Sequence, residues 1–231
     1  MKTLGMIGGI GPESTQEYYR LLIAAYREKV RDGSYPPIII NSIDLQKMVD
    51  LFEANDLAGV VRRLLDELAR LAAARADFAL LSANTPHIVF DDLRRQSSLP
   101  LVSIVEATRD AAKALGLSKL GLFGTRFTMQ GRFYPEVFSR AGIALAVPQA
   151  EEQAIIHDKY MNELVKGIFR SETREQLLGI VDRLVQCEGI QGLILGGTEL
   201  PLILKDDAGR GIPFLDTTRI HVDAAIKMML S

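Results

Sequence analysis

Short apolar runs alternate with long amphipathic stretches along this chain, and no other feature limits its fold as strongly. The runs that we expect to form strands are residues 3–7, 37–41, 78–81, 101–103, 119–123, 144–147, 192–195 and 213–215. Between them, as in residues 57–71 and 177–185, apolar residues recur at the three- and four-residue spacing typical of amphipathic helices. This alternation predicts an α/β fold, with mainly parallel sheets covered by helices on both faces.

The composition excludes several classes of partner. With 231 residues, 48% of them apolar, the chain can bury a full core. The chain has 27 basic and 29 acidic residues, and its basic residues are not gathered into a stripe that could bind a phosphate backbone. We therefore expect no nucleic-acid partner. No apolar run approaches the roughly 18 residues that span a bilayer, and glycines interrupt the apolar start. We therefore expect a cytoplasmic protein with no membrane partner.

The single cysteine, Cys187, cannot form an internal disulfide bond. It lies at the end of a stretch with helical apolar periodicity. We expect a buried, chemically inert thiol at this position.

Turns of glycine or other small residues follow four of the apolar runs, two in each half of the chain. They are residues 8–11, 82–85, 124–125 and 196–198. Two pseudo-symmetric lobes that face each other across a cleft would account for this weak repeat. We expect the first lobe to comprise residues 1–103 plus 216–231, and the second residues 104–215.

The first of these turns joins a strand to a helix that begins near Pro12 and Glu13. Free backbone N–H groups at such a helix start attract anions, which favours a small carboxylate as ligand. A dinucleotide is excluded because the Gly-x-Gly-x-x-Gly spacing is absent. A tight turn without any ligand remains the alternative.

Short polar side chains follow two other apolar runs. Asn84 and Thr85 come after one strand, and Thr198 and Glu199 come after another, at the carboxyl ends where open α/β sheets bind ligands. These groups suit a carboxylate or an amino group, although each pair could also be a helix cap. Thr128 could likewise bind an anion or belong to a helix cap. Residues 216–218 are most simply a helix cap.

His87 and His221 each lie about one helical turn after one of these motifs. Either histidine could reach a ligand or could be a structural residue with satisfied hydrogen bonds. His157 lies in an acidic, polar stretch, where we expect it to be solvated. No histidine pair has the spacing of metal ligands, so we predict no metal site.

Taken together, these motifs resemble the ordered signatures of the aspartate/glutamate racemase family. The matching segments are residues 1–15, 41–42, 83–87, 124–129, 196–199 and 216–221. The resemblance implies two α/β lobes, an active site between them and, commonly, a homodimer. It also implies that no cofactor is used.

In that family, two acid/base groups, usually thiols, flank the amino acid and exchange its α-proton from opposite faces. The resemblance places these groups at Ala83 and Gly197, neither of which carries a proton to transfer. It also implies that Asn84, Thr85 and Thr198 hold the substrate's carboxylate and amino group, and that Ile10 and Thr128 line the site. Lys166 lies one residue beyond the place of the family lysine that can hold a distal carboxylate.

Three explanations of the missing thiols stay open. In the first, the protein is an amino-acid racemase acting on aspartate or glutamate, with other proton carriers. The candidates are Glu199, His87, His221, Asp44, Ser82 and an ordered water. In the second, it is a ligand-binding pseudoenzyme without turnover. In the third, Gly197 is an engineered replacement of a native cysteine.

Overall fold

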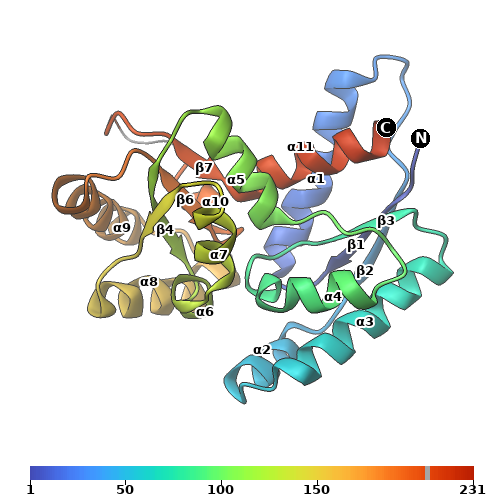
Figure 1. Cartoon of the computed structure of the whole chain (residues 1–231), viewed down its shortest axis with the longest axis horizontal. Helices are drawn as coiled ribbons and strands as arrows, with labels where there is room; N and C mark the ends of the chain where they lie inside the picture. Colours follow the sequence, from blue (N-terminus) through green and yellow to red (C-terminus); the bar gives the residue numbers. More distant parts are fainter. Residues whose placement is uncertain (206–208) are drawn as a thin grey trace. The chain divides into compact units, whose positions relative to one another are not determined.

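The computed structural model describes residues 1–205 and 209–231 of the chain. These residues form two compact units, the first of Met1–Ser103 with His221–Ser231 and the second of Ile104–Ile220. Each unit is built on its own parallel β-sheet, with helices connecting the strands (Figure 1). The predicted α/β class is therefore confirmed.

The first unit contains a three-stranded sheet of order β2-β1-β3. Its strands are β1 (Leu4–Gly8), β2 (Ile38–Ser42) and β3 (Phe78–Leu81). Leu4 is in register with both Ile38 and Phe78, so the two outer strands run parallel to the central one. The helices are α1 (Pro12–Lys29), α2 (Leu45–Glu53), α3 (Leu57–Ala73), η1 (Thr85–Val89), α4 (Phe90–Gln96) and most of α11 (Thr217–Leu230).

Helices cover both faces of this sheet, as the apolar character of its strands requires. Leu4 and Met6 pack on one face against residues of α1 and α11, including Tyr18 and Ile226. On the other face α3 approaches closely at Gly5, where an added Cβ would lie 3.1 Å from Cδ1 of Leu71. Figure 1 shows α3 running along the sheet. All five residues of β1 are buried.

The second unit contains a four-stranded parallel sheet of order β5-β4-β6-β7. Its strands are β4 (Lys119–Gly124), β5 (Ala144–Ala146), β6 (Leu193–Gly196) and β7 (Phe214–Asp216). The helical segments are α5 (Ile104–Ala114), α6 (Arg126–Gln130), α7 (Phe133–Ser139), α8 (Ala150–Asn162), η2 (Leu164–Lys166), α9 (Ser171–Arg183), η3 (Leu184–Glu188) and α10 (Leu200–Ile203). The first residues of α11 also belong to this unit.

The core of the second unit lies between the sheet and helices α8 and α9. Phe123 of β4 and Leu195 of β6 pack against Ile156 and Tyr160 of α8 and against Leu177 of α9. Tyr160 is thus held on a rigid element beside the end of a central strand.

The expected strand at residues 101–103 does not form. Leu101 makes one isolated parallel bridge with Ala79. In this bridge the N–H of Ala79 donates to the carbonyl of Pro100, and the N–H of Val102 donates to the carbonyl of Ala79. Proline has no backbone N–H to donate to a ladder. Helix α5 then begins at Ile104, which leaves too few residues for a strand.

The expectation of a buried Cys187 is wrong, because this thiol is exposed. Helix α9 passes into the π-type turn η3, which contains Cys187. The wider turn changes the helical periodicity after the buried Leu184, so Cys187 lies on the solvent side.

Within residues 1–205 and 209–231, none of the helices combines the length and the apolar character needed to cross a bilayer.

Candidate functional site

A tight turn follows β1 in the first unit. Gly9 has a φ of 79°, and its N–H donates to Oγ1 of Thr15 in α1 over 2.8 Å. A Cβ at Gly9 would overlap the carbonyl oxygen of Ile43, so only glycine fits this turn. The turn holds Ile10, which is 8% exposed, beside the carboxyl end of β1.

Ser82 closes the end of β3 against the neighbouring strand. Its backbone N–H and its hydroxyl both donate to the carbonyl of Ile7, at 3.0 Å each. The hydroxyl of Ser14, in α1, donates to the carbonyl of Ser82 over 2.8 Å. The proton of Ser82 is thus engaged in joining two strands, which weakens the interpretation of Ser82 as a proton carrier.

Ala83, Asn84 and Thr85 follow directly. Ala83 and Asn84 are buried and Thr85 is half-buried. Asn84 has helical backbone angles, and its side chain makes no capping hydrogen bond to the described residues of η1. The structure therefore does not bear out the alternative that Asn84 is a helix cap.

His87 is buried one turn after Ala83. Its Nδ1–H donates to the carbonyl of Ala83 over 3.0 Å, because a carbonyl can only accept. The ring stacks on Phe90, with 4.8 Å between centroids, and its centroid lies 6.1 Å from that of His221. Burial lowers the pKa of His87 to about 3, with a further contribution from His221. The imidazole is neutral near pH 7.

His221 is a second buried, neutral imidazole of the first unit. Its Nε2–H donates to the carbonyl of Val102 over 3.0 Å, and its Nδ1 accepts from the hydroxyl of Tyr18 over 2.9 Å. Burial lowers the pKa of His221 to about 4. The two partners fix both the tautomer and the ring orientation, so His221 serves the structure of this unit.

In the second unit, the turn after β4 begins α6. The hydroxyl of Thr125 accepts from the N–H of Thr128 over 3.3 Å, which is a helix cap. The hydroxyls of Thr125 and Thr128 lie 3.2 Å apart, and Thr128 is fully buried. Its packing depends on Gly124, where an added Cβ would lie 2.8 Å from the Cβ of Thr128.

At the end of β6, the side-chain space of Gly197 is already filled. A Cβ built on Gly197 would overlap Cε2 of Tyr160 and would lie 2.9 Å from Cζ and 3.0 Å from the hydroxyl oxygen. The phenol of Tyr160 thus occupies the volume where a larger residue at position 197 would place its side chain. No sequence motif had indicated Tyr160.

Tyr160 and Thr198 converge on Glu199. The carboxylate oxygen Oε2 of Glu199 accepts hydrogen bonds from the hydroxyl of Tyr160 and, over 2.9 Å, from the hydroxyl of Thr198. Glu199 is 1% exposed and Tyr160 is 6% exposed. Burial, and then the charge of Glu199, raise the pKa of Tyr160 well above its usual value. Tyr160 therefore holds its proton, and Glu199 is a buried acceptor that this proton already faces.

We refer to residues 82–87 with Ile10 as the first half-site, and to residues 197–199 with Tyr160 as the second half-site. Each lies in one unit, at the carboxyl end of parallel strands, where α/β sheets bind their ligands.

Asp44, a candidate proton carrier, and Lys166, next to the place of the family lysine, both lie at the protein surface. Asp44 is exposed and caps α2 by accepting from the N–H of Gln46 over 2.9 Å. Lys166 is exposed, with its Nζ 3.4 Å from Oδ1 of Asn162. The structure gives Asp44 a structural role, and it shows no carboxylate-binding arrangement around Lys166 among the described residues.

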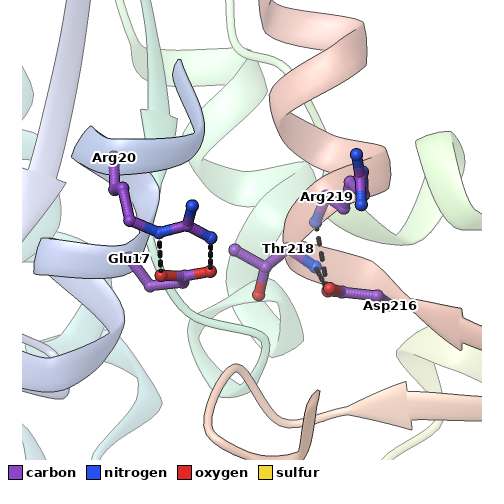
Figure 2. Close-up of polar contacts among 5 residues, drawn as sticks. All are labelled: Glu17, Arg20, Asp216, Thr218 and Arg219. Carbon is purple, nitrogen blue, oxygen red and sulfur yellow. Dashed lines mark hydrogen bonds and ion pairs between the residues drawn. The ribbon is translucent and has the colours of Figure 1, made fainter. Parts of the chain in front are cut away.

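The predicted cap at residues 216–218 is confirmed. Oδ1 of Asp216 accepts from the N–H of Thr218 over 2.9 Å and from the N–H of Arg219 over 3.1 Å, as Figure 2 shows. The hydroxyl of Thr217 donates to the carbonyl of Leu195 over 2.7 Å, which joins α11 to β6. The ion pair of Glu17 and Arg20, also drawn in Figure 2, is a contact within α1.

A hollow of about 250 Å³ lies between α6 and α8, lined in part by Arg126, Gln130 and His157. His157 is half-buried there, and its Nδ1 accepts from the N–H of Arg126 over 3.2 Å. The solvated position expected for His157 is confirmed only in part, because the ring is half-buried. Among the residues that the structure describes, no group of three His, Cys, Asp or Glu side chains could hold a metal ion.

The family model that matches this chain is described as Asp/Glu/Hydantoin racemase and covers residues 7–225. An aspartate racemase homologue from Pyrococcus horikoshii OT3 is 33% identical, with a TM-score of 0.85 and complete coverage of both chains. A structure from Yersinia pestis, described as a candidate Asp/Glu racemase, is 31% identical, with a TM-score of 0.90 and complete coverage of both chains. The broad specificity amino-acid racemase RacX of Bacillus subtilis strain 168 is 23% identical over 239 residues, covering 99% of this chain and 98% of RacX.

Proposed function

Because the chain belongs to the Asp/Glu/Hydantoin racemase family, we propose that it binds aspartate or glutamate and exchanges the proton on the α-carbon without a cofactor. The observation that supports this most strongly is at the second half-site, where the phenol of Tyr160 fills the side-chain space of Gly197 and donates a hydrogen bond to the buried Glu199.

Binding is assigned to the short polar groups after β3 and β6. Asn84, Thr85 and Thr198 offer amide and hydroxyl groups that can donate to a carboxylate or accept from an ammonium group. The N–H groups of the turn after β1 add donors at the start of α1. Ile10 and Thr128, both buried, are assigned to the lining of the site by the family resemblance.

Chemistry without a cofactor needs a proton carrier for each face of the α-carbon. Neither Ala83 nor Gly197 can serve. In the first half-site, the neutral imidazole of His87, or a water bound beside it, is the remaining candidate. In the second half-site, Glu199 can accept a proton and Tyr160 can pass one.

A second candidate function is a binding protein that has lost turnover. The observation in its favour is that the first half-site offers only weak bases, since the pKa of His87 is about 3 and the hydroxyl of Ser82 bonds to Ile7. If Gly197 replaces a native cysteine, the phenol of Tyr160 must lie elsewhere in the cysteine-containing protein, because it fills the side-chain space at position 197 here.

Isothermal titration calorimetry with both enantiomers of aspartate and glutamate tests the binding proposal. Binding of at least one of the four, and none of leucine, supports it. If all four give no heat and no thermal shift, recognition of acidic amino acids is ruled out. Light scattering on the same sample tests the homodimer that the family resemblance leads us to expect, and fractionation of native cells tests a cytoplasmic location.

A further inference from the structure

The second half-site contains a proton path that does not depend on a thiol. We infer that Tyr160 takes the place of the side chain missing at Gly197, and that Tyr160 and Glu199 together form the proton relay of this half-site. The inference rests on the proposed function and assigns the groups that carry it out.

A side chain at position 197 and the phenol of Tyr160 require the same space. A Cβ at position 197 would lie 3.0 Å from the hydroxyl oxygen of Tyr160, so any side chain there would compete with that oxygen for the same space. The phenol also cannot be moved aside cheaply, because Tyr160 packs in the core with Ile156 and Leu195. Glycine at 197 and tyrosine at 160 are therefore complementary in volume.

Two hydroxyl groups converge on one carboxylate oxygen of Glu199. Tyr160 donates to Oε2 of Glu199, and Thr198 donates to the same oxygen. Both residues are buried, with 1% of Glu199 and 6% of Tyr160 exposed. The phenol oxygen adjoins the side-chain space of Gly197 and also bonds the carboxylate, so it is the group through which a proton can pass from that space to Glu199.

Charge and protons balance in both directions of the proposed transfer. When the Cα–H bond breaks, its electron pair stays on carbon and the proton goes to the Tyr160 oxygen, while the phenol's own proton passes to Oε2 of Glu199. Tyr160 stays neutral and Glu199 becomes a neutral acid. The reverse transfer returns a proton to carbon and restores the carboxylate. The high pKa of Tyr160 is no obstacle, since no free phenolate forms.

A relay on one face of the α-carbon acts on one enantiomer, and this gives a test. The α-hydrogen exchange of L- and D-aspartate and of L- and D-glutamate is followed in heavy water by proton NMR. We expect Tyr160→Phe to slow exchange at least about 100-fold for one enantiomer and to leave the other within about threefold. Glu199→Gln should affect the same enantiomer. The matched control is Tyr134→Phe, which removes a buried hydroxyl elsewhere in the same unit.

Circular dichroism and calorimetry of each variant show whether folding and amino-acid binding are retained. If Tyr160→Phe exchanges both enantiomers at the rates of the unmodified protein, or slows both equally, the relay is wrong while the proposed function stands. If the unmodified protein binds these amino acids but exchanges neither enantiomer, the proposed chemistry fails, and the relay fails with it. Should Tyr160→Phe not fold, the enantiomer dependence of Glu199→Gln decides.

Discussion

The hydroxyl of Tyr18, in α1, donates a hydrogen bond to Nδ1 of His221, in α11, over 2.9 Å and across 203 positions of sequence. This bond joins the N-terminal and C-terminal helices of the first unit in its buried core. It also leaves the Nε2–H of His221 to donate to Val102, which positions the chain between β3 and α5.

Replacement of Tyr18 by phenylalanine tests the importance of this bond. The variant leaves Nδ1 of His221 buried without its donor, which should lower the free energy of unfolding by about 1–3 kcal/mol. Urea denaturation measures the change. Tyr19→Phe is the control, because Tyr19 lies on the same helix and is 48% exposed, and it should have almost no effect. Equal stabilities of the two variants would show that the buried bond is unimportant.

The two buried imidazoles predict how stability depends on pH. Their native pKa values of about 3 and about 4 lie below the usual 6.5, so between pH 6.5 and pH 4 the unfolded chain binds protons that the native protein does not. The free energy of unfolding should therefore be complete above pH 6.5 and fall as the pH drops, by about 1.4 kcal/mol per pH unit for each histidine.

Urea denaturation from pH 7 to pH 4 measures this slope. His87→Asn keeps a side-chain N–H that can donate to the carbonyl of Ala83, and it should reduce the slope by about 1.4 kcal/mol per unit. An unchanged slope in this variant would mean that His87 is protonated in the native protein. A resonance of the His87 ring that titrates near pH 6.5 would mean the same.

Gly197→Ala should destabilise the protein by about 1–3 kcal/mol, because the new methyl group overlaps the ring of Tyr160. Gly179→Ala is the matched control. Gly179 lies within α9 with open space around its Cβ position, so alanine there should be neutral or stabilising by up to about 1 kcal/mol. The cost of Gly197→Ala should largely vanish in a Tyr160→Ala background. If Gly197→Ala still destabilises the protein in the Tyr160→Ala background, the strain lies in the backbone at position 197 and not in the overlap with the ring.

Cys187 should react with thiol reagents in the folded protein, because it is exposed. The modified protein should bind and exchange amino acids at unchanged rates, since position 187 lies in the turn η3 and outside both half-sites. Mass spectrometry confirms complete labelling, and Cys187→Ser provides the control. Loss of exchange after labelling, but not in Cys187→Ser, would reveal a steric effect. Loss in both would make this thiol part of the chemistry.

The sequence predicted the strands well where apolar runs were bounded by helical periodicity, as for β1, β3 and β6. It failed at residues 101–103, where composition alone could not show that α5 would begin so soon. It also failed at Cys187, because a helical period cannot reveal a π-type turn.

The half-sites were predictable only in part. The sequence indicated Asn84 and Thr198 as candidates because polar residues after strands form recognisable motifs. Tyr160 was missed because its neighbours in sequence form no motif, and its partner Glu199 lies 39 positions away. The glycine at 197 was a signal that space must be filled, but sequence alone does not say which residue fills it. Tyr18 was missed for the same reason, since only the folded core brings it to His221.

Uptake of deuterium at the α-carbon of aspartate and glutamate in heavy water tests most directly whether a family member lacking thiols at Ala83 and Gly197 can still move this proton. We expect uptake into at least one of the two amino acids, proportional to protein concentration and unaffected by alkylation of Cys187. No uptake from any enantiomer by folded protein that binds the amino acid would contradict this expectation.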